Sequence, residues 1–177
     1  MRPVVGISAE LVAFVAISLL ALAVPGGLAY AIYVVALELS ATYLVHCPAH
    51  YLTGTALGIR FRDIRVGRTT LARVLPGEAA AVVRVLPVLT LSVEKGSIAR
   101  VSRRRASAMY AAGTVASVSA AFLISLASLW AEPMTYAALA WALACAYLIF
   151  NLVFSPRSGD LMRSRRALRG GTVITSA

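Results

Sequence analysis

The sequence is poor in acidic side chains and in the residue types that usually carry catalysis. Its 177 residues include 7 acidic residues against 17 basic ones, with only 2 histidines and 2 cysteines. Both cysteines, Cys47 and Cys145, lie in apolar stretches, so a disulfide framework of the secreted kind is not indicated, and the cysteines assign no redox compartment. Since both histidines lie in one hydrophobic segment, that segment is the first candidate for a functional site.

Long apolar runs, by contrast, make up most of the chain. Hydrophobic residues are 60% of the sequence, and the mean hydropathy is +0.82. A soluble domain of this size could not bury so much apolar surface. We therefore expect a single integral membrane domain, residues 1–177, in the cell membrane, with the net charge of +10 concentrated in cytoplasmic segments.

Four apolar runs predict an all-α bundle of four transmembrane helices. The expected spans cover residues 4–24, 28–57, 106–130 and 134–154. Glu10, the one charge in the first run, is interpreted as lying near the membrane surface. Pro48 removes a backbone hydrogen bond to Leu44, so the second span is expected to bend at the histidine pair.

The segment 59–105, between the second and third spans, is basic and contains short alternating patterns. Ile59–Arg62 and Leu89–Glu94 alternate apolar and polar residues, and Lys95-Gly96 reads as a turn before a further short strand at Ile98–Val101. These patterns predict a small cytoplasmic β-element between helices 2 and 3.

The charges of the segments between the spans predict the orientation of the chain across the membrane. The insert 59–105 and the tail 155–177 are basic, whereas the loops 25–27 and 131–133 carry no positive charge, so both termini are expected in the cytoplasm. The basic side chains are expected to contact anionic membrane lipid. Nucleic acid is not favoured as a partner, because Phe61 is the one aromatic residue interleaved with these arginines.

His46-Cys-Pro-Ala-His50 places both imidazoles on one face of a helix. Two imidazoles and one carboxylate form a typical catalytic zinc shell with an open fourth position. Glu38 lies two helical turns before His46, about 12 Å along the axis, and is a candidate supporting residue because intramembrane carboxylates are usually functional. Asn151 and Asp160, at the end of the fourth span, are expected on the same side of the membrane as the histidines.

Three segments together resemble the site-2 proteases, a family of zinc intramembrane metalloproteases. The first is the histidine pair followed by Leu57-Gly-Ile-Arg60, which is similar to the family's His-Glu-x-x-His helix and the strand after it. The second, Arg105–Gly113, is similar to its entry into a small-residue helix. The third, Asn151–Asp160, is similar to the segment that supplies the third zinc ligand, so the resemblance implies a metal site of His46, His50 and Asp160.

Cys47 stands where the family has its general-base glutamate. Such a base contributes typically ~10²- to 10⁴-fold to the rate, and a thiol is a poor substitute. The favoured hypothesis is a catalytically degenerate relative that binds a membrane partner or substrate helix. Two alternatives stay open: an active zinc protease with a non-standard base, and a structural membrane subunit without metal. Whether the chain is an enzyme is therefore left open by the sequence.

Overall fold

The computed structural model describes residues 2–24, 27–67, 77–78, 81, 88–131 and 134–170. The described part is mostly helical, with one small sheet. Its elements are α1 (Pro3–Leu19), η1 (Leu20–Leu22), α2 (Leu28–Leu44), α3 (His46–Ala56), β1 (Phe61–Gly67), β2 (Val88–Val93), α5 (Lys95–Arg100), α6 (Arg103–Ala131), α7 (Met134–Ser158) and α8 (Asp160–Leu168).

Three helical segments are long and apolar enough to cross a membrane: Leu28–Ala56, Arg103–Trp130 and Met134–Arg157. Helix α1 is also apolar but has 17 residues. At 1.5 Å per residue it extends about 25 Å, short of a hydrocarbon core of ~30 Å. The mostly helical fold is thus confirmed, and the three long apolar helices indicate membrane association, whereas the fourth span stays a prediction.

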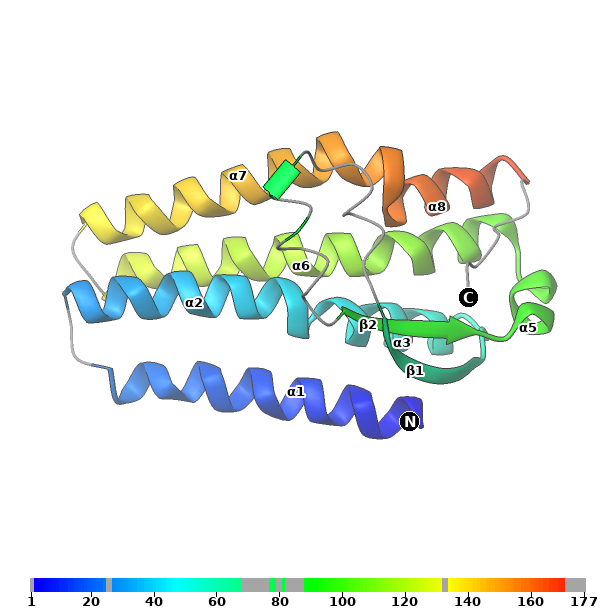
Figure 1. Ribbon diagram of the computed structural model, residues 1–177, viewed down its shortest axis with the longest axis horizontal. Coiled ribbons are helices and arrows are strands. Elements are labelled where there is room, and N and C mark those ends of the chain that lie inside the picture. Colours follow the sequence, from blue (N-terminus) through cyan, green and yellow to red (C-terminus); the bar gives the residue numbers. More distant parts are fainter. Residues whose placement is uncertain are drawn as a thin grey trace.

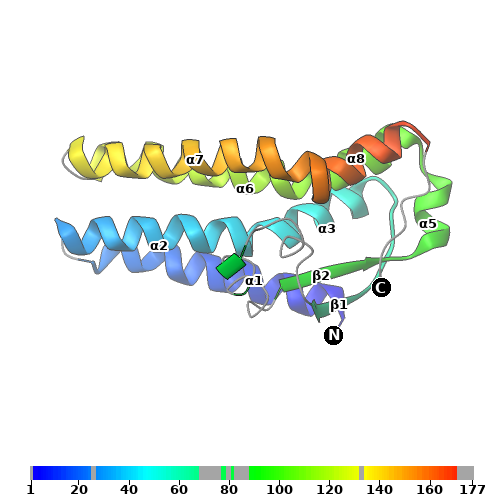
Figure 2. The ribbon, with the colours of Figure 1, turned by 45° about the horizontal axis from the view of Figure 1, so that its top comes forward.

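Helix α6 is the centre of the bundle. It packs against α2, α3, α7 and α8, while α1 contacts α2, α3 and β1. Figure 1 shows the long helices running side by side, with α6 between α2 and α7 and with α1 on the outer side of α2. Figure 2 shows that α3, α5, α8 and the sheet all lie at one end of these helices.

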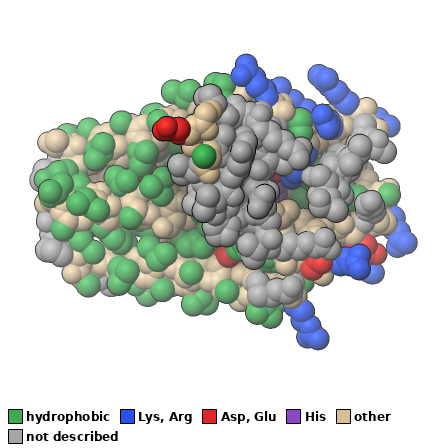
Figure 3. Space-filling model, viewed as in Figure 1, with side chains coloured by type: hydrophobic (Ala, Val, Ile, Leu, Met, Phe, Trp, Pro, Cys, Tyr) green, Lys and Arg blue, Asp and Glu red, His purple; other side chains and the backbone are tan. Residues whose placement is uncertain are grey.

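The two ends of the molecule also differ in the side chains on their surface. In Figure 3, hydrophobic side chains cover the end formed by the long helices, and Lys and Arg side chains gather at the end that carries α8 and the sheet. This is the separation expected of a membrane protein with one basic face.

The sheet contains β1 and β2, paired antiparallel, with Phe61 opposite Val93 and an irregularity between Phe61 and Asp63. A small β-element between the second span and α6 is therefore confirmed. The predicted strand at Ile98–Val101 is wrong, because Lys95–Arg100 forms helix α5. Two hydrogen bonds of Ser97 support the first turn of α5. The Ser97 hydroxyl donates to the Glu94 carbonyl at 2.8 Å and accepts from the Arg60 N–H at 2.9 Å.

The expected bend in the second span is present and separates α2 from α3 at Val45. The Ala49 N–H still donates to the Val45 carbonyl at 3.1 Å, but Pro48 has no N–H to offer the Leu44 carbonyl. Since α3 begins at His46, the histidine pair lies in the first two turns of a new helix.

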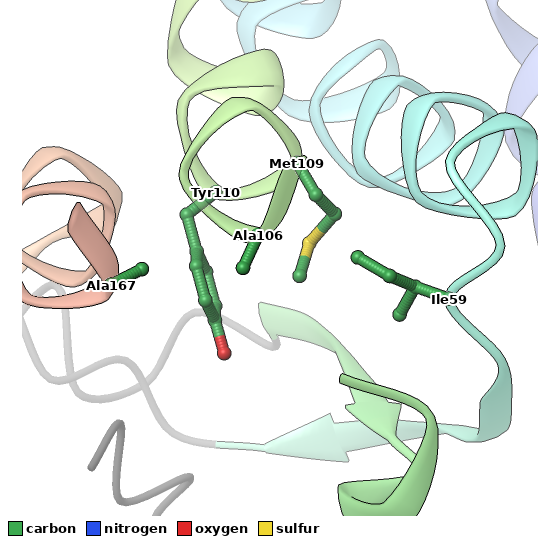
Figure 4. Close-up of a cluster of buried hydrophobic side chains, with 5 residues drawn as sticks. All are labelled: Ile59, Ala106, Met109, Tyr110 and Ala167. Carbon is green, nitrogen blue, oxygen red and sulfur yellow. The ribbon is translucent and has the colours of Figure 1, made fainter. Parts of the chain in front are cut away.

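Two apolar clusters hold the basic end together. One contains Ile59, Ala106, Met109, Tyr110 and Ala167. Figure 4 shows the α6 members of this cluster lying between Ile59 on one side and Ala167 of α8 on the other. This packing fixes α8, which lies within the segment predicted as a basic tail, against the start of α6. The second cluster joins α1, α3 and β1 through Ile7, Cys47 and Ile64.

Candidate metal centre

The two histidines lie on the same side of α3, one helical turn apart. Their ring centroids are 4.8 Å apart at an interplanar angle of 82°, and their Nε2 atoms are 3.2 Å apart. His50 is buried, whereas the His46 side chain is 32% exposed, which leaves the pair reachable from one side. The i, i+4 spacing therefore places both imidazoles on one face of the helix, as the sequence predicted.

Asp160 reaches the histidines from α8. Its Oδ2 lies 2.8 Å from His46 Nε2 and 3.1 Å from His50 Nε2, and one ligand atom from each residue fits within 4.8 Å of the others. Asp160 is the first residue of α8, after an extended Gly159. A β-carbon at Gly159 would lie 2.8 Å from Ser155 Oγ, so the turn that delivers the carboxylate needs glycine.

Hydrogen bonds on the far side of each ring assign the tautomers. His50 Nδ1 is 2.7 Å from the Met109 carbonyl, which can only accept, so this nitrogen carries the hydrogen. Ser117 Oγ donates its single hydrogen to the Thr42 carbonyl at 3.1 Å, so it accepts from His46 Nδ1 at 3.3 Å. Both Nε2 atoms of the neutral rings therefore present lone pairs toward the centre.

Three electron-pair donors thus converge with no hydrogen between them. A carboxylate oxygen and two unprotonated nitrogens at 2.8 to 3.2 Å repel one another unless a proton or a cation lies among them. Tetrahedral ligands at ~2.0 to 2.1 Å from zinc are about 3.3 Å apart, close to these separations. The donor set and its outer hydrogen bonds accordingly fit a metal ion.

The electrostatics of Asp160 suit the same role. Burial alone would raise the pKa of this carboxyl, but when protonated imidazoles take the place of a metal ion, their hydrogen bonds to Asp160 and their charges outweigh burial and hold the pKa well below its usual value. The other oxygen, Oδ1, accepts a hydrogen bond from Arg163 at 3.4 Å. Asp160 is therefore an anion, the form that binds metal.

Gly113 of α6 makes room for one of the rings, a role that the sequence analysis did not assign. A β-carbon there would lie 2.6 Å from His50 Cδ2 and 2.8 Å from Cε1, and closer still to Nε2. The run of small residues around Gly113 indicated close helix packing. That run was the available signal, but it does not say that the neighbour is an imidazole.

Cys47 does not join the three ligands in the part of the chain that the structure describes. Its thiol is buried and donates to the Leu89 carbonyl of β2 at 3.2 Å. The side chain therefore fastens the sheet to α3. Cys47 occupies the general-base position of the resembled motif in the sequence, but it is not one of the three grouped ligands.

The two supporting candidates occupy different places. Glu38 does not reach the histidines; its Oε1 accepts the Ser125 hydroxyl at 2.7 Å. Asn151 donates to the Tyr147 carbonyl at 3.0 Å and interacts with the Tyr147 side chain, which in turn interacts with Ser117. Asn151 is thus linked to the metal centre indirectly, and Glu38 belongs to a separate pocket.

Glu10 corrects the sequence interpretation. The sequence favoured a place near the membrane surface over a buried role, but Glu10 is buried in the protein, with 4% of its surface exposed. Neither carboxylate oxygen has a hydrogen-bond partner among the described residues. The interpretation was wrong because the apolar run gives no helical face, and the face is set by how α1 packs.

No protein-family model, curated protein or solved structure matches this chain.

Proposed function

We propose that this chain is a site-2-protease-like membrane protein that holds a zinc ion on His46, His50 and Asp160 and binds a transmembrane helix of a partner protein. One observation carries the proposal. The Nε2 atoms of both histidines and Oδ2 of Asp160 converge within 3.2 Å of one another, while the Nδ1 atoms are occupied by Met109 and Ser117. Such outer hydrogen bonds are what orients metal-binding imidazoles.

Zinc is favoured over other ions by the ligand types. Two imidazoles and one carboxylate, with a fourth position open, form a common catalytic zinc shell, and hard ions such as Mg²⁺ prefer oxygen ligands. Bound here, the ion would supply Lewis-acid polarisation of a carbonyl oxygen. The partly exposed His46 lies on the side from which a partner could approach.

Binding without ordinary hydrolysis is supported by the position of Cys47. Its hydrogen bond to Leu89 directs the thiol toward β2, and no side chain of the ligand group is a free proton acceptor once all three bind metal. Among the residues that the structure describes, Cys47 is therefore not available as a base beside the ligands of the proposed centre. A relative that keeps the metal but has lost the base would retain helix binding.

The membrane setting of the proposal follows from charge. Arg163, Arg165, Arg166 and Arg169 lie on or just after α8, and Arg103–Arg105 open α6 at the same end of the bundle. We propose that this end faces the cytoplasm and anionic lipid, with both termini inside and α1 as a fourth span.

Metal analysis of the purified protein tests the metal proposal. The wild type should contain about one zinc per chain after incubation with zinc and desalting, and His46→Ala and Asp160→Ala should contain little. Glu94→Gln, an exposed carboxylate away from the site, serves as the control and should keep the metal. A metal-free but folded wild type would refute the proposal and favour a histidine–aspartate ion pair.

Cleavage of a transmembrane peptide tests the loss of catalysis. Wild type and Cys47→Glu are compared in the same vesicles, with chelator as the control. We expect no chelator-sensitive cleavage by the wild type. Cleavage by the wild type that chelation removes would show that the chain is an active protease with a non-standard base.

A further inference from the structure

A half-open pocket of about 290 Å³ lies between α2 and α7, away from the metal ligands. Its wall is almost wholly apolar and includes Leu143 and Phe150 of α7, while Ala121 of α6 contributes a small side chain. Glu38 is the one ionisable carboxylate in the lining. A pocket of this character takes an apolar group that also carries one polar atom.

Glu38 has one oxygen that lacks a partner. Its side chain is 2% exposed, and Oε1 accepts the Ser125 hydroxyl, but Oε2 has no hydrogen-bond partner among the described residues. Leaving such a group unpaired in apolar surroundings is costly, so buried polar groups usually have partners. The missing partner of Oε2 is therefore expected from a molecule that enters the pocket.

The depth of Glu38 limits what that molecule can be. Glu38 lies ten residues after Leu28, where α2 begins, which is about 15 Å along the helix. With α2 entering the hydrocarbon core at Leu28, as the proposed orientation requires, a core ~30 Å thick places the carboxyl near the middle of the membrane. Lipid headgroups stay at the surface, and the backbone amides of a helix are satisfied within it, so a side chain on a transmembrane helix is the polar group that reaches this depth.

The pocket also adjoins the outer hydrogen bonds of the metal centre. Thr42 and Tyr147 both line it. The Thr42 carbonyl accepts from Ser117, the residue that accepts from His46, and Tyr147 interacts with Ser117 as well. A helix seated in the pocket would therefore lie against the residues that orient His46.

We propose that this pocket receives an uncharged amide or hydroxyl side chain carried at the middle of a partner's transmembrane helix, with Glu38 as its hydrogen-bonding group. The inference rests on the proposed function, because it names what the partner helix must carry. Glu38 pairs with the incoming side chain through Oε2 while Ser125 holds Oε1. The apolar wall accommodates the neighbouring aliphatic side chains of the helix.

Synthetic helices of known sequence test this inference. A Leu-rich peptide of about 20 residues with one central Asn is compared with the all-Leu peptide and with a peptide whose Asn is near one end. Binding to the zinc-loaded full chain in lipid nanodiscs is followed by energy transfer between labels at low peptide density. Interhelical polar contacts in membranes predict about threefold to thirtyfold tighter binding of the central-Asn peptide to the wild type.

Substitutions of Glu38 test whether this residue causes the preference for the central-Asn peptide. Glu38→Leu should bind the central-Asn and all-Leu peptides equally, while Glu38→Gln, which keeps the shape and a hydrogen-bonding group, should retain a preference. Glu10→Leu removes the other buried carboxylate of the N-terminal helices and should leave the preference unchanged. Zinc content and helical circular dichroism of each variant confirm that the fold and metal centre are intact.

The outcomes separate the two proposals. A wild type that binds zinc but none of the peptides would contradict the proposed helix-binding function. A wild type that binds the all-Leu peptide as tightly as the central-Asn peptide would overturn the pocket inference alone. Retention of the preference in a folded Glu38→Leu variant would overturn it as well.

Discussion

Replacement of Gly113 by alanine is expected to weaken zinc binding more than it weakens the fold. The new β-carbon would lie 2.6 Å from His50 Cδ2, where ordinary contact begins at 3.4 Å, so the imidazole must move by about 0.8 Å. The ring cannot move freely, because Nδ1 is held by the Met109 carbonyl at 2.7 Å. The shift is large beside the range of about 0.2 Å within which metal–ligand distances are expected to fall.

The expected loss of zinc affinity can be gauged from changes to the groups that orient metal ligands in other proteins. Disturbing groups that orient a metal ligand typically costs 10- to 100-fold in affinity, and we expect a loss at least that large because the ligand itself is displaced. Overpacking a core costs typically ~1 to 3 kcal/mol of unfolding free energy, which a folded membrane protein can survive.

Competition against a chromophoric chelator measures the zinc affinity, and thermal unfolding measures the stability. Gly96→Ala is the matched control, since a β-carbon there meets nothing within 4 Å, and it should bind zinc like the wild type. Wild-type zinc affinity in a folded Gly113→Ala protein would refute the assignment of His50 as a ligand in this geometry.

Three further substitutions test individual contacts. Ser117→Ala removes the acceptor for His46 Nδ1–H, and chelator competition should show zinc affinity about 10- to 100-fold weaker. Cys47→Ala breaks the bond to β2 but removes no ligand, so zinc affinity should stay within about twofold by the same assay; a large loss would show that the thiol binds metal. Ser125→Ala leaves Glu38 Oε1 without its donor and should lower the unfolding free energy by about 1 to 3 kcal/mol, whereas no change in steric-trapping or denaturation measurements would mean that water replaces the hydroxyl.

The course of the chain around the histidines could be predicted because it depends on local rules. Helical periodicity places His46 and His50 on one face, and Pro48 imposes a bend wherever the rest of the chain lies. The alternating residues before Glu94 also predict a strand correctly. The segment after it was misassigned. Ser97 donates a local hydrogen bond to Glu94 and accepts a second one from Arg60, and the second bond forms only when the chain entering β1 lies beside Ser97.

The carboxylates show where sequence reasoning reaches its limit. Glu10, Glu38 and Asp160 all lie in or beside apolar runs, and hydropathy does not distinguish their environments. Their environments in the structure differ. Asp160 contacts the histidines, Glu38 lines a separate pocket, and Glu10 is buried without a hydrogen-bond partner among the described residues. Asp160 was identified through the resemblance to a known family and not through any local pattern.

By itself, the sequence determined that the protein is helical, that it has segments long and apolar enough to span a membrane, and that two imidazoles share one face of a helix, because hydropathy and helical spacing are properties of short segments. Only the tertiary structure decided which carboxylate meets them, which ring nitrogens face inward and where the Cys47 thiol points. Those features depend on the packing of α6 against α3 and α8, which joins Gly113, Ser117 and Asp160 to His46 and His50 across long stretches of chain. Long-range contacts of this kind leave no periodic trace in the sequence.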